Sequence, residues 1–86
     1  MQVQPTVGPK WAFGTVLREC RKGAGLSQEQ MAVKAGLDRS FLSMVERGIQ
    51  SPNIVVLFRI AEVLGVPASE LIARTEAGAQ VPPPQN

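Results

Sequence analysis

The sequence contains no histidine and no tyrosine, and it has a single cysteine and a single aspartate among its 86 residues. One cysteine excludes a disulfide within the chain, and the lack of histidine removes Cys/His metal sites and histidine-based catalysis. The longest apolar run, Ile54 to Phe58, is far shorter than the ~20 residues that a membrane span needs. The first residues lack a basic stretch followed by an apolar core, so no signal peptide is expected. These absences argue against an enzyme, a cofactor, a metal and a membrane partner. They favour the reducing cytoplasm as the location of the protein.

What is present is enough for one small domain. Hydrophobic residues make up 44% of the chain, which can form one compact core. A domain of this size buries only ~60% of the surface of its unfolded chain, so we expect marginal stability and a tendency to self-associate. Residues 10–47 hold seven basic and four acidic side chains, although the whole chain has a net charge of only +2. The excess in the first half is a weak indication of a polyanionic partner.

The two ends of the sequence differ in composition from its middle. Residues 1–10 carry two prolines and a glycine without apolar periodicity, and residues 75–86 include three consecutive prolines. We therefore expect a flexible arm over 1–10, one folded domain over 11–74, and a disordered proline-rich tail over 75–86. The tail is a candidate for binding a partner protein.

The middle contains five stretches with helical spacing and no convincing strand pattern, which predicts an all-α fold. The first helix is expected over about 13–24, with one apolar stripe formed by Phe13, Val16, Leu17, Cys20 and Ala24. The fourth is expected from its N-cap Asn53 to Gly65, and it is apolar nearly all round. The fifth is expected from about Pro67 to Arg74, with Leu71 and Ile72 as its anchors.

Two short helices between them carry the functional prediction. Ser27 and Gln30 have the spacing of a capping box, and the inward residues that follow are Met31, Ala32 and Ala35, before Gly36. The next helix, here named the reading helix, is expected to begin at the N-cap Asp38 and to point Leu42 and Val45 inward. A short turn containing glycine between two such helices predicts a helix-turn-helix, whose second helix fits a DNA major groove about 12 Å wide.

Five segments match one known pattern together: LSQEQMA at 26–32, AGL at 35–37, FLSMVERG at 41–48, IAEVLGV at 60–66 and SEL at 69–71. With these residues the chain resembles the lambda-repressor-like (XRE) family of Cro/repressor-type regulators, from about Phe13 to Arg74. The resemblance implies a compact five-helix domain that binds double-stranded DNA and regulates transcription. It implies most often a repressor, acting as a homodimer on a palindromic operator with half-sites about one turn (~34 Å) apart. Such small stand-alone domains are common on phages and plasmids.

The resemblance also assigns roles to individual residues. Base reading is implied for Arg39, Ser40, Ser43 and Met44, which together are named the reading face here. Contacts with DNA phosphates are implied for Ser27, Gln28, Lys34, Arg47 and Asn53, and an ion pair between the first and third helices for Arg21 and Glu46. Gln28 is also implied to support the reading helix. Methionine cannot hydrogen-bond a base well but can pack on a thymine methyl. The fork of Arg39 fits guanine O6 and N7, so Arg39 is the main candidate for sequence reading.

Several other residues are expected to have structural roles. The dimer surface is expected on the outward side of the fourth helix and on the fifth, with Val55, Val56, Val63 and Ile72 as candidates. Cys20 is expected to be a buried small hydrophobe. Trp11 is expected to anchor the arm on the core, and Phe41 to pack beneath the reading helix.

Three alternatives remain open from the sequence. The same fold could serve a restriction-modification controller, or an antitoxin whose proline-rich tail binds a partner. A protein-interaction module that does not bind DNA would fit the nearly neutral net charge. An enzyme is the third alternative, but the chain has too few residues suited to acid–base chemistry.

Overall fold

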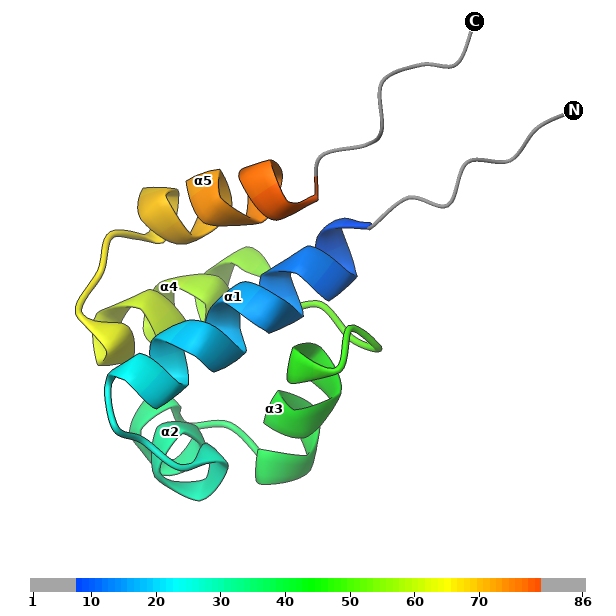
Figure 1. Ribbon diagram of the computed structural model, residues 1–86. Helices are drawn as coiled ribbons and strands as arrows, with labels where there is room; N and C mark the ends of the chain where they lie inside the picture. Colours follow the sequence, from blue (N-terminus) through cyan, green and yellow to red (C-terminus); the bar gives the residue numbers. More distant parts are fainter. Residues whose placement is uncertain (1–7, 80–86) are drawn as a thin grey trace, which may run out of the picture.

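The computed structural model describes residues 8–79. Within this range the chain forms five α-helices joined by turns and loops, and no strand (Figure 1). They are α1 Pro9–Gly23, α2 Gln28–Ala35, α3 Arg39–Glu46, α4 Ile54–Leu64 and α5 Ala68–Gly78. Helices α1 and α4 lie in the middle of the molecule, with α5 on one side and the α2–α3 pair on the other (Figure 1). The predicted all-α five-helix fold is confirmed.

Helix α1 begins earlier than the sequence pattern predicted. It starts at Pro9, so Lys10 and Trp11 belong to the helix and do not precede it. Proline suits a first helical position because its missing N–H has no partner in the helix, and the Ala12 N–H already donates to the Gly8 carbonyl at 3.0 Å. The expected boundary after residue 10 therefore falls inside α1. Residues 1–7 of the expected arm lie outside the described residues.

Helix α5 ends later than predicted. It continues past Arg74 to Gly78, with Pro67 as its N-cap. The Thr75 hydroxyl is buried and donates to the Leu71 carbonyl at 2.7 Å, which satisfies a polar side chain on the packed side of the helix. The expected boundary after residue 74 thus falls inside α5, and residues 80–86 of the expected tail lie outside the described residues. Of the two expected anchors only Leu71 is buried, because Ile72 is 48% exposed.

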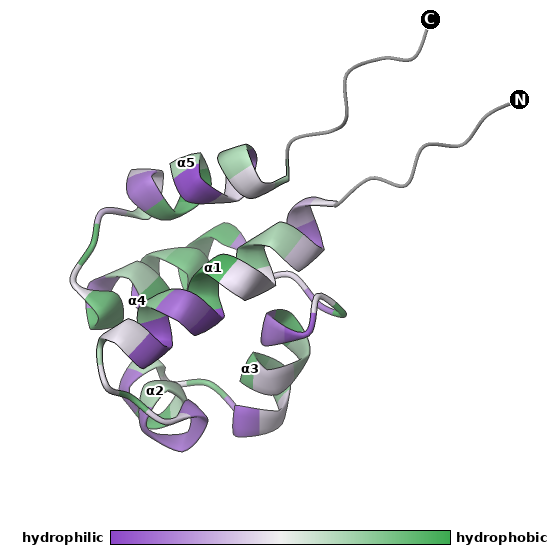
Figure 2. Cartoon of the chain, in the orientation of Figure 1, coloured by the Kyte–Doolittle hydropathy of each residue, from purple (hydrophilic) through white to green (hydrophobic). Residues whose placement is uncertain are grey.

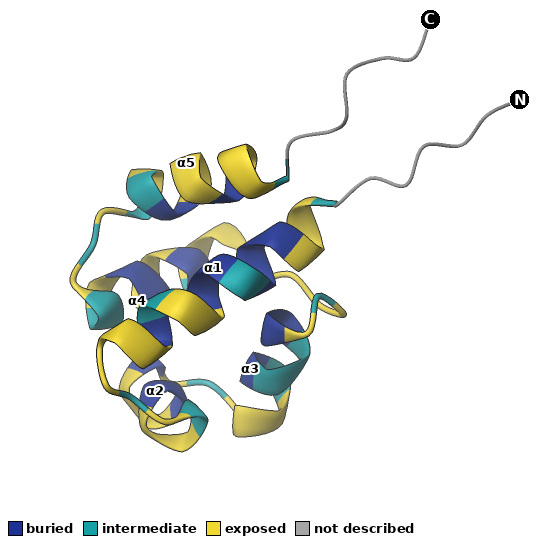
Figure 3. Cartoon of the chain, viewed as in Figure 1, coloured by how far each residue is buried: buried dark blue, intermediate teal, exposed yellow. Residues whose placement is uncertain are grey.

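The hydrophobic core lies where all five helices meet. Its cluster consists of Phe13, Val16, Leu17, Met31, Ala32, Leu42, Val45, Leu57, Ile60, Ala61 and Leu71. Figure 2 shows α4 as the most hydrophobic helix, and Figure 3 shows the buried residues on the sides of the helices that face one another. Cys20 is only half-buried at the edge of this cluster and Ala24 is exposed, so the expectation of a buried Cys20 was too strong. Phe41 packs against the core, as expected.

Local capping explains the short helices. The Ser27 hydroxyl accepts from the Gln30 N–H at 3.0 Å, and the Gln30 side chain accepts from the Ser27 N–H at 2.8 Å. The predicted capping box is thereby confirmed. Asp38 occupies the N-cap position of α3 but makes no side-chain cap, which corrects that part of the prediction. Gly36 ends α2 with φ 69°, a left-handed conformation that glycine adopts without steric cost.

None of the helices in residues 8–79 is both long enough and apolar enough to cross a membrane.

Candidate nucleic-acid interface

Helix α3 presents a polar side away from the core. Arg39 and Ser40 in its first turn are exposed, whereas Leu42 and Val45 on the opposite side are completely buried. Ser43 and Met44, the remaining members of the reading face, are half-buried. Figure 3 shows the exposed first turn of α3 at the edge of the molecule. The helix is therefore anchored along one side and accessible at its N-terminal end.

Glu46, at the C-terminal end of α3, connects three helices. Its carboxylate accepts hydrogen bonds from Arg21 on α1, at 2.6 Å from Nε and 3.0 Å from Nη2. Gln28, the first residue of α2, donates from its side-chain Nε2 to the same carboxylate at 3.0 Å. Arg21 Nη1 also donates to the Leu26 carbonyl at 2.8 Å, before α2. The ion pair that the resemblance implies is present, and it belongs to a network that fixes α3 against α1 and α2.

The electrostatics of this network favour the charged state of both partners. Burial alone would raise the pKa of the Glu46 carboxyl. Hydrogen bonds from Arg21 and Gln28, together with the charges of Arg21 and Arg18, outweigh burial and hold that pKa below its ordinary value. The hydrogen bond to Glu46 raises the pKa of Arg21. The pair therefore remains ionised at neutral pH, as a buried pair must if it is to orient two helices.

Gly14 allows α1 and α3 to approach at the level of their backbones. A Cβ at Gly14 would lie 2.6 Å from the Glu46 carbonyl oxygen and would also collide with the Val45 carbonyl oxygen. One turn further along α1, Arg18 Nη2 donates to the Glu46 carbonyl at 3.4 Å. The last turn of α3 is thus held by α1 through both backbone and side-chain contacts.

Most residues expected at phosphates retain groups that can donate. Asn53 caps α4 by accepting from the Val56 N–H at 2.8 Å through Oδ1, which leaves its amide NH₂ group available.

The other residues expected at phosphates differ in their orientation. Arg47 is exposed directly after α3. Lys34 is exposed on the outward side of α2, beside Glu29, Gln30 and Val33, whereas Gln28 turns toward α3.

Sequence reasoning missed Gly14, although a glycine inside an apolar helical pattern is a signal of close packing. The support that Gln28 gives to the reading helix is implied by the resemblance, and the bond from Gln28 to Glu46 provides it. Helical spacing alone gives no signal of that bond, because the two residues are brought together by the turn between α2 and α3. The described residues contain no cluster of side chains that would hold a metal ion.

The expected dimer candidates do not form one surface. Val55 is 57% exposed and Ile72 is 48% exposed. Val56 and Val63 are half-buried and pack against the core cluster. The exposed neighbours of Val55 are instead Ile54 and Phe58, which were not among the candidates.

Comparison with known proteins identifies the family of the chain. The family model HTH_3, described as helix-turn-helix, matches residues 17–71. The restriction-modification controller protein C.AhdI from Aeromonas hydrophila is 43% identical, with a TM-score of 0.69 over 71% of this chain and 92% of that one. SinR, the master regulator for biofilm formation, whose structure was solved in complex with DNA, is 36% identical, with a TM-score of 0.67 over 70% of this chain and 97% of that one.

A relative found by sequence points in the same direction. The cryptic phage CTXphi transcriptional repressor RstR from Vibrio cholerae is 31% identical over 64 residues, which cover 74% of this chain and 58% of RstR. The matched region includes both helices of the helix-turn-helix and the residues of the Glu46 network. The chain therefore belongs to the lambda-repressor-like helix-turn-helix family HTH_3, and it is a transcriptional regulator with a DNA-binding fold and not an enzyme.

Proposed function

We propose that the protein binds duplex DNA at specific sequences and represses transcription, as a homodimer on an operator with two-fold symmetry. The main support is that α3 is exposed at one end and held in place at the other. Its first turn carries exposed Arg39 and Ser40, and its last turn is fixed by the buried network around Glu46. A short helix that is accessible at its N-terminal end and held rigidly at the other suits insertion into a major groove.

The roles within the interface follow from side-chain chemistry. Arg39 donates two parallel hydrogen bonds to guanine O6 and N7, and Ser40 and Ser43 donate to or accept from neighbouring base edges. Met44 packs on a thymine methyl. Phosphates on one side of the groove are bound by Ser27 and Gln28 and on the other by Arg47 and Asn53, while Lys34 adds positive charge.

Repression is favoured over activation by the likeness to RstR, whose name describes it as a transcriptional repressor. Binding over a promoter needs no contact beyond DNA itself. A regulator of this kind acts where its DNA lies, so we place the protein in the cytoplasm. A partner protein that binds the proline-rich tail expected from the sequence would add a further level of control.

Selection of bound fragments from random duplex DNA tests the proposal. We expect the full chain to enrich a two-fold symmetric sequence whose half-sites lie about 34 Å apart, and this operator to lower expression when it overlaps a reporter promoter. No enrichment, together with DNA binding that is absent at low salt, would favour a protein-interaction module. Increased reporter expression would show an activator.

A second candidate keeps the same interface but changes its target. The 43% identity to the controller protein C.AhdI favours a regulator of restriction and modification genes. The neighbouring genes decide between the two, because a controller of this kind is expected beside a methyltransferase and an endonuclease. The enriched operator should then lie upstream of those genes.

A further inference from the structure

We propose that Trp11, in the first turn of α1, binds the sugar–phosphate backbone of the DNA and extends the interface beyond the helix-turn-helix. The inference rests on the proposed function, since it adds a contact to the same complex. It differs from the role that the sequence suggests, in which Trp11 anchors the arm on the core.

The side chain of Trp11 is open to solvent although tryptophan is the largest residue of the chain. Trp11 is 53% exposed, whereas its neighbours Ala12 and Phe13 are buried. Its indole N–H donates to no protein group within residues 8–79. An exposed apolar side chain is normal on a protein surface, but an indole combines an apolar ring with a hydrogen-bond donor. It therefore suits a ligand that offers both an apolar surface and acceptor oxygens.

Trp11 is held against the segment that follows α3. Gly48 comes directly after the C-cap residue Arg47 and has φ 79°. A Cβ on Gly48 would lie 3.0 Å from the Cα atom of Trp11 and 3.5 Å from its Cδ1 atom. Figure 1 shows the start of α1 beside the loop between α3 and α4. The first turn of α1 and this loop are thus in contact, and the missing side chain of Gly48 makes the approach possible.

One side of α1 follows the chain from the last turn of α3 into this loop. Trp11 and Gly14 are three residues apart, so they lie on the same side of the helix. Gly14 approaches the carbonyl oxygen of Glu46, and Trp11 approaches Gly48, two residues further on. Arg47, between them in the chain, is exposed and is expected at a phosphate. The indole is therefore continuous with the proposed DNA interface.

The charges around Trp11 identify the occupant. Arg47 is exposed directly before Gly48, and the side chain of Arg18, two turns along α1, is 46% exposed, whereas the Glu46 carboxylate is buried. Exposed basic side chains beside a buried carboxylate favour a polyanion over a protein partner. In DNA the deoxyribose offers an apolar surface to the indole ring, and phosphate oxygens accept from the indole N–H. Because Trp11 carries no charge, it adds affinity without adding to the release of counterions.

Intrinsic fluorescence tests the contact directly, because Trp11 is the only tryptophan and the chain has no tyrosine. The full chain is titrated with a duplex that carries a single half-site, so that association between two copies does not contribute. We expect the emission of Trp11 to change with the same midpoint as binding measured by the anisotropy of labelled DNA. Acrylamide should quench the complex less than the free protein. Emission and quenching that stay unchanged at saturating DNA would overturn the proposal.

Trp11→Phe tests the hydrogen bond, because it keeps an aromatic ring near Gly48 and removes the N–H. We expect it to bind the half-site about tenfold more weakly, as for the loss of a hydrogen bond to a charged group. The loss should be equal for every operator sequence. The slope of log K against log salt concentration should keep its wild-type value, because no charge is removed.

Ile72→Ala is the matched control, at a side chain that is 48% exposed on α5, and it should bind the half-site as the wild type does. Thermal unfolding should show that both variants fold, since both side chains are exposed. Wild-type affinity in Trp11→Phe, or an equal loss of affinity in Ile72→Ala, would contradict the contact. The fluorescence titration uses the wild-type chain, so its result does not depend on how well a variant folds.

The two experiments distinguish failure of this inference from failure of the proposed function. If the wild type has no sequence preference, but any duplex shields Trp11 and binds Trp11→Phe more weakly, the proposed function fails and this inference stands. If the wild type prefers one operator while Trp11 remains unshielded, the inference fails and the proposed function stands. A chain that binds no duplex even at low salt would overturn both.

Discussion

At the scale of single residues, Arg39 is the side chain most directly available to a base. It is exposed in the first turn of α3, and no ion pair holds it within the described part of the chain. We expect Arg39→Ala to reduce discrimination at one base pair of the operator by about 1–3 kcal/mol, the value of one bidentate contact with guanine. Competition with operators that carry single substitutions measures this loss, position by position.

The control for Arg39 removes an arginine from the opposite side of the molecule. Arg74 on α5 is exposed and donates to Glu70 and to Cys20 Sγ, so Arg74→Ala changes the net charge equally without reaching α3. Both variants should unfold at nearly the wild-type temperature, because substitutions of exposed residues change stability by only about 0.5 kcal/mol. An equal loss of affinity for every operator in the Arg39 variant, with discrimination between base pairs unchanged, would show that Arg39 contacts phosphate.

Glu46 both stabilises the fold and orients α3. The variant Glu46→Gln separates the effect of its charge from the effect of its packing. The substitution keeps the shape of the side chain but leaves the Arg21 guanidinium buried without an opposite charge. Breaking a buried pair in this way costs about 3–5 kcal/mol, a large part of the about 5–15 kcal/mol that stabilises a native domain. Denaturant titration measures the difference. A loss below about 1 kcal/mol, the range of exposed pairs, would contradict the role assigned to Glu46.

The same carboxyl group predicts a dependence of stability on pH. The pKa of Glu46 is lower in the folded protein than its ordinary value, so its contribution is complete above the unfolded pKa of about 4.3. The contribution is lost as pH falls through the folded pKa. The stability difference between wild type and Glu46→Gln should therefore be constant near neutral pH and shrink below about pH 4.3. Urea titrations of both proteins at a series of pH values provide the measurement, and a difference that grew on acidification would reverse the assigned sign.

At the scale of helices, the contact between α1 and α3 depends on Gly14. Gly14→Ala should favour α1 as a helix by up to about 1 kcal/mol. The new Cβ would nevertheless meet backbone oxygens of Val45 and Glu46, which cannot rotate away. We expect a net destabilisation of about 1–3 kcal/mol and a displacement of the last turn of α3. Operator affinity, measured where the variant is fully folded, should fall as well, because the reading face moves with that turn.

Gly23→Ala supplies the matched control on the same helix. A Cβ at Gly23 has no atom within 4 Å, so this variant should be neutral or slightly more stable and should bind DNA normally. If the Gly14 variant lost only stability and bound DNA like the Gly23 variant, then the close approach would serve packing alone. The comparison therefore distinguishes a glycine that positions α3 from one that merely fits.

The sequence predicts correctly those features that depend on residues close to one another in the chain. The capping box at Ser27, the cap at Asn53, and the inward residues Leu42 and Val45 follow from neighbours within one or two turns, and all are found in the structure. The start of α1 and the end of α5 were placed wrongly because apolar periodicity fades at helix ends, where a proline or a buried Thr75 decides. The contacts of Gly14 and Gln28 with α3 depend on how the helices cross, and helical spacing does not contain that information.

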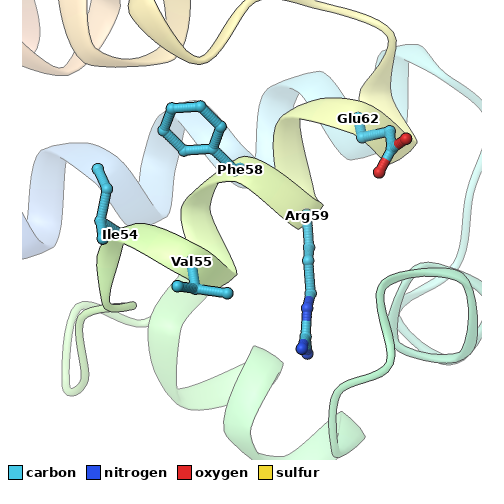
Figure 4. A pocket seen from close by; sticks show the side chains of 5 residues that line it. All are labelled: Ile54, Val55, Phe58, Arg59 and Glu62. Carbon is cyan, nitrogen blue, oxygen red and sulfur yellow. The ribbon is translucent and has the colours of Figure 1, made fainter.

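At the scale of the whole molecule, α4 carries the exposed apolar side chains Ile54, Val55 and Phe58 (Figure 4) and packs against the helix that precedes the reading helix. Helix α4 packs against α2, and Arg59 lies beside Gly36 in the turn between α2 and α3. If two copies join through α4, each subunit would hold its α3 at a fixed distance from the symmetry axis. Such an arrangement would allow a domain with one core to recognise two half-sites, and it would separate an apolar contact between proteins from a polar contact with DNA.

That separation predicts how salt acts on the two contacts. Each phosphate neutralised by a basic side chain contributes about −0.9 to the slope of log K against log salt concentration. Arg47, exposed directly after α3, should contribute once in each subunit. Arg47→Ala is therefore expected to make the slope shallower by about two units for the dimer, while the preferred sequence stays the same. Fluorescence anisotropy between about 50 and 200 mM salt measures both quantities.

Arg74→Ala again provides the control, since α5 carries it away from the proposed DNA surface, and its slope should equal that of the wild type. If the exposed side chains Ile54, Val55 and Phe58 join two copies, dimerisation measured over the same salt range should weaken far less than DNA binding, because salt screens charges and not apolar contacts. A wild-type slope for Arg47→Ala would remove that residue from the phosphate contacts. Dimerisation as sensitive to salt as DNA binding would mean that charges, and not Ile54, Val55 and Phe58, hold the two subunits together.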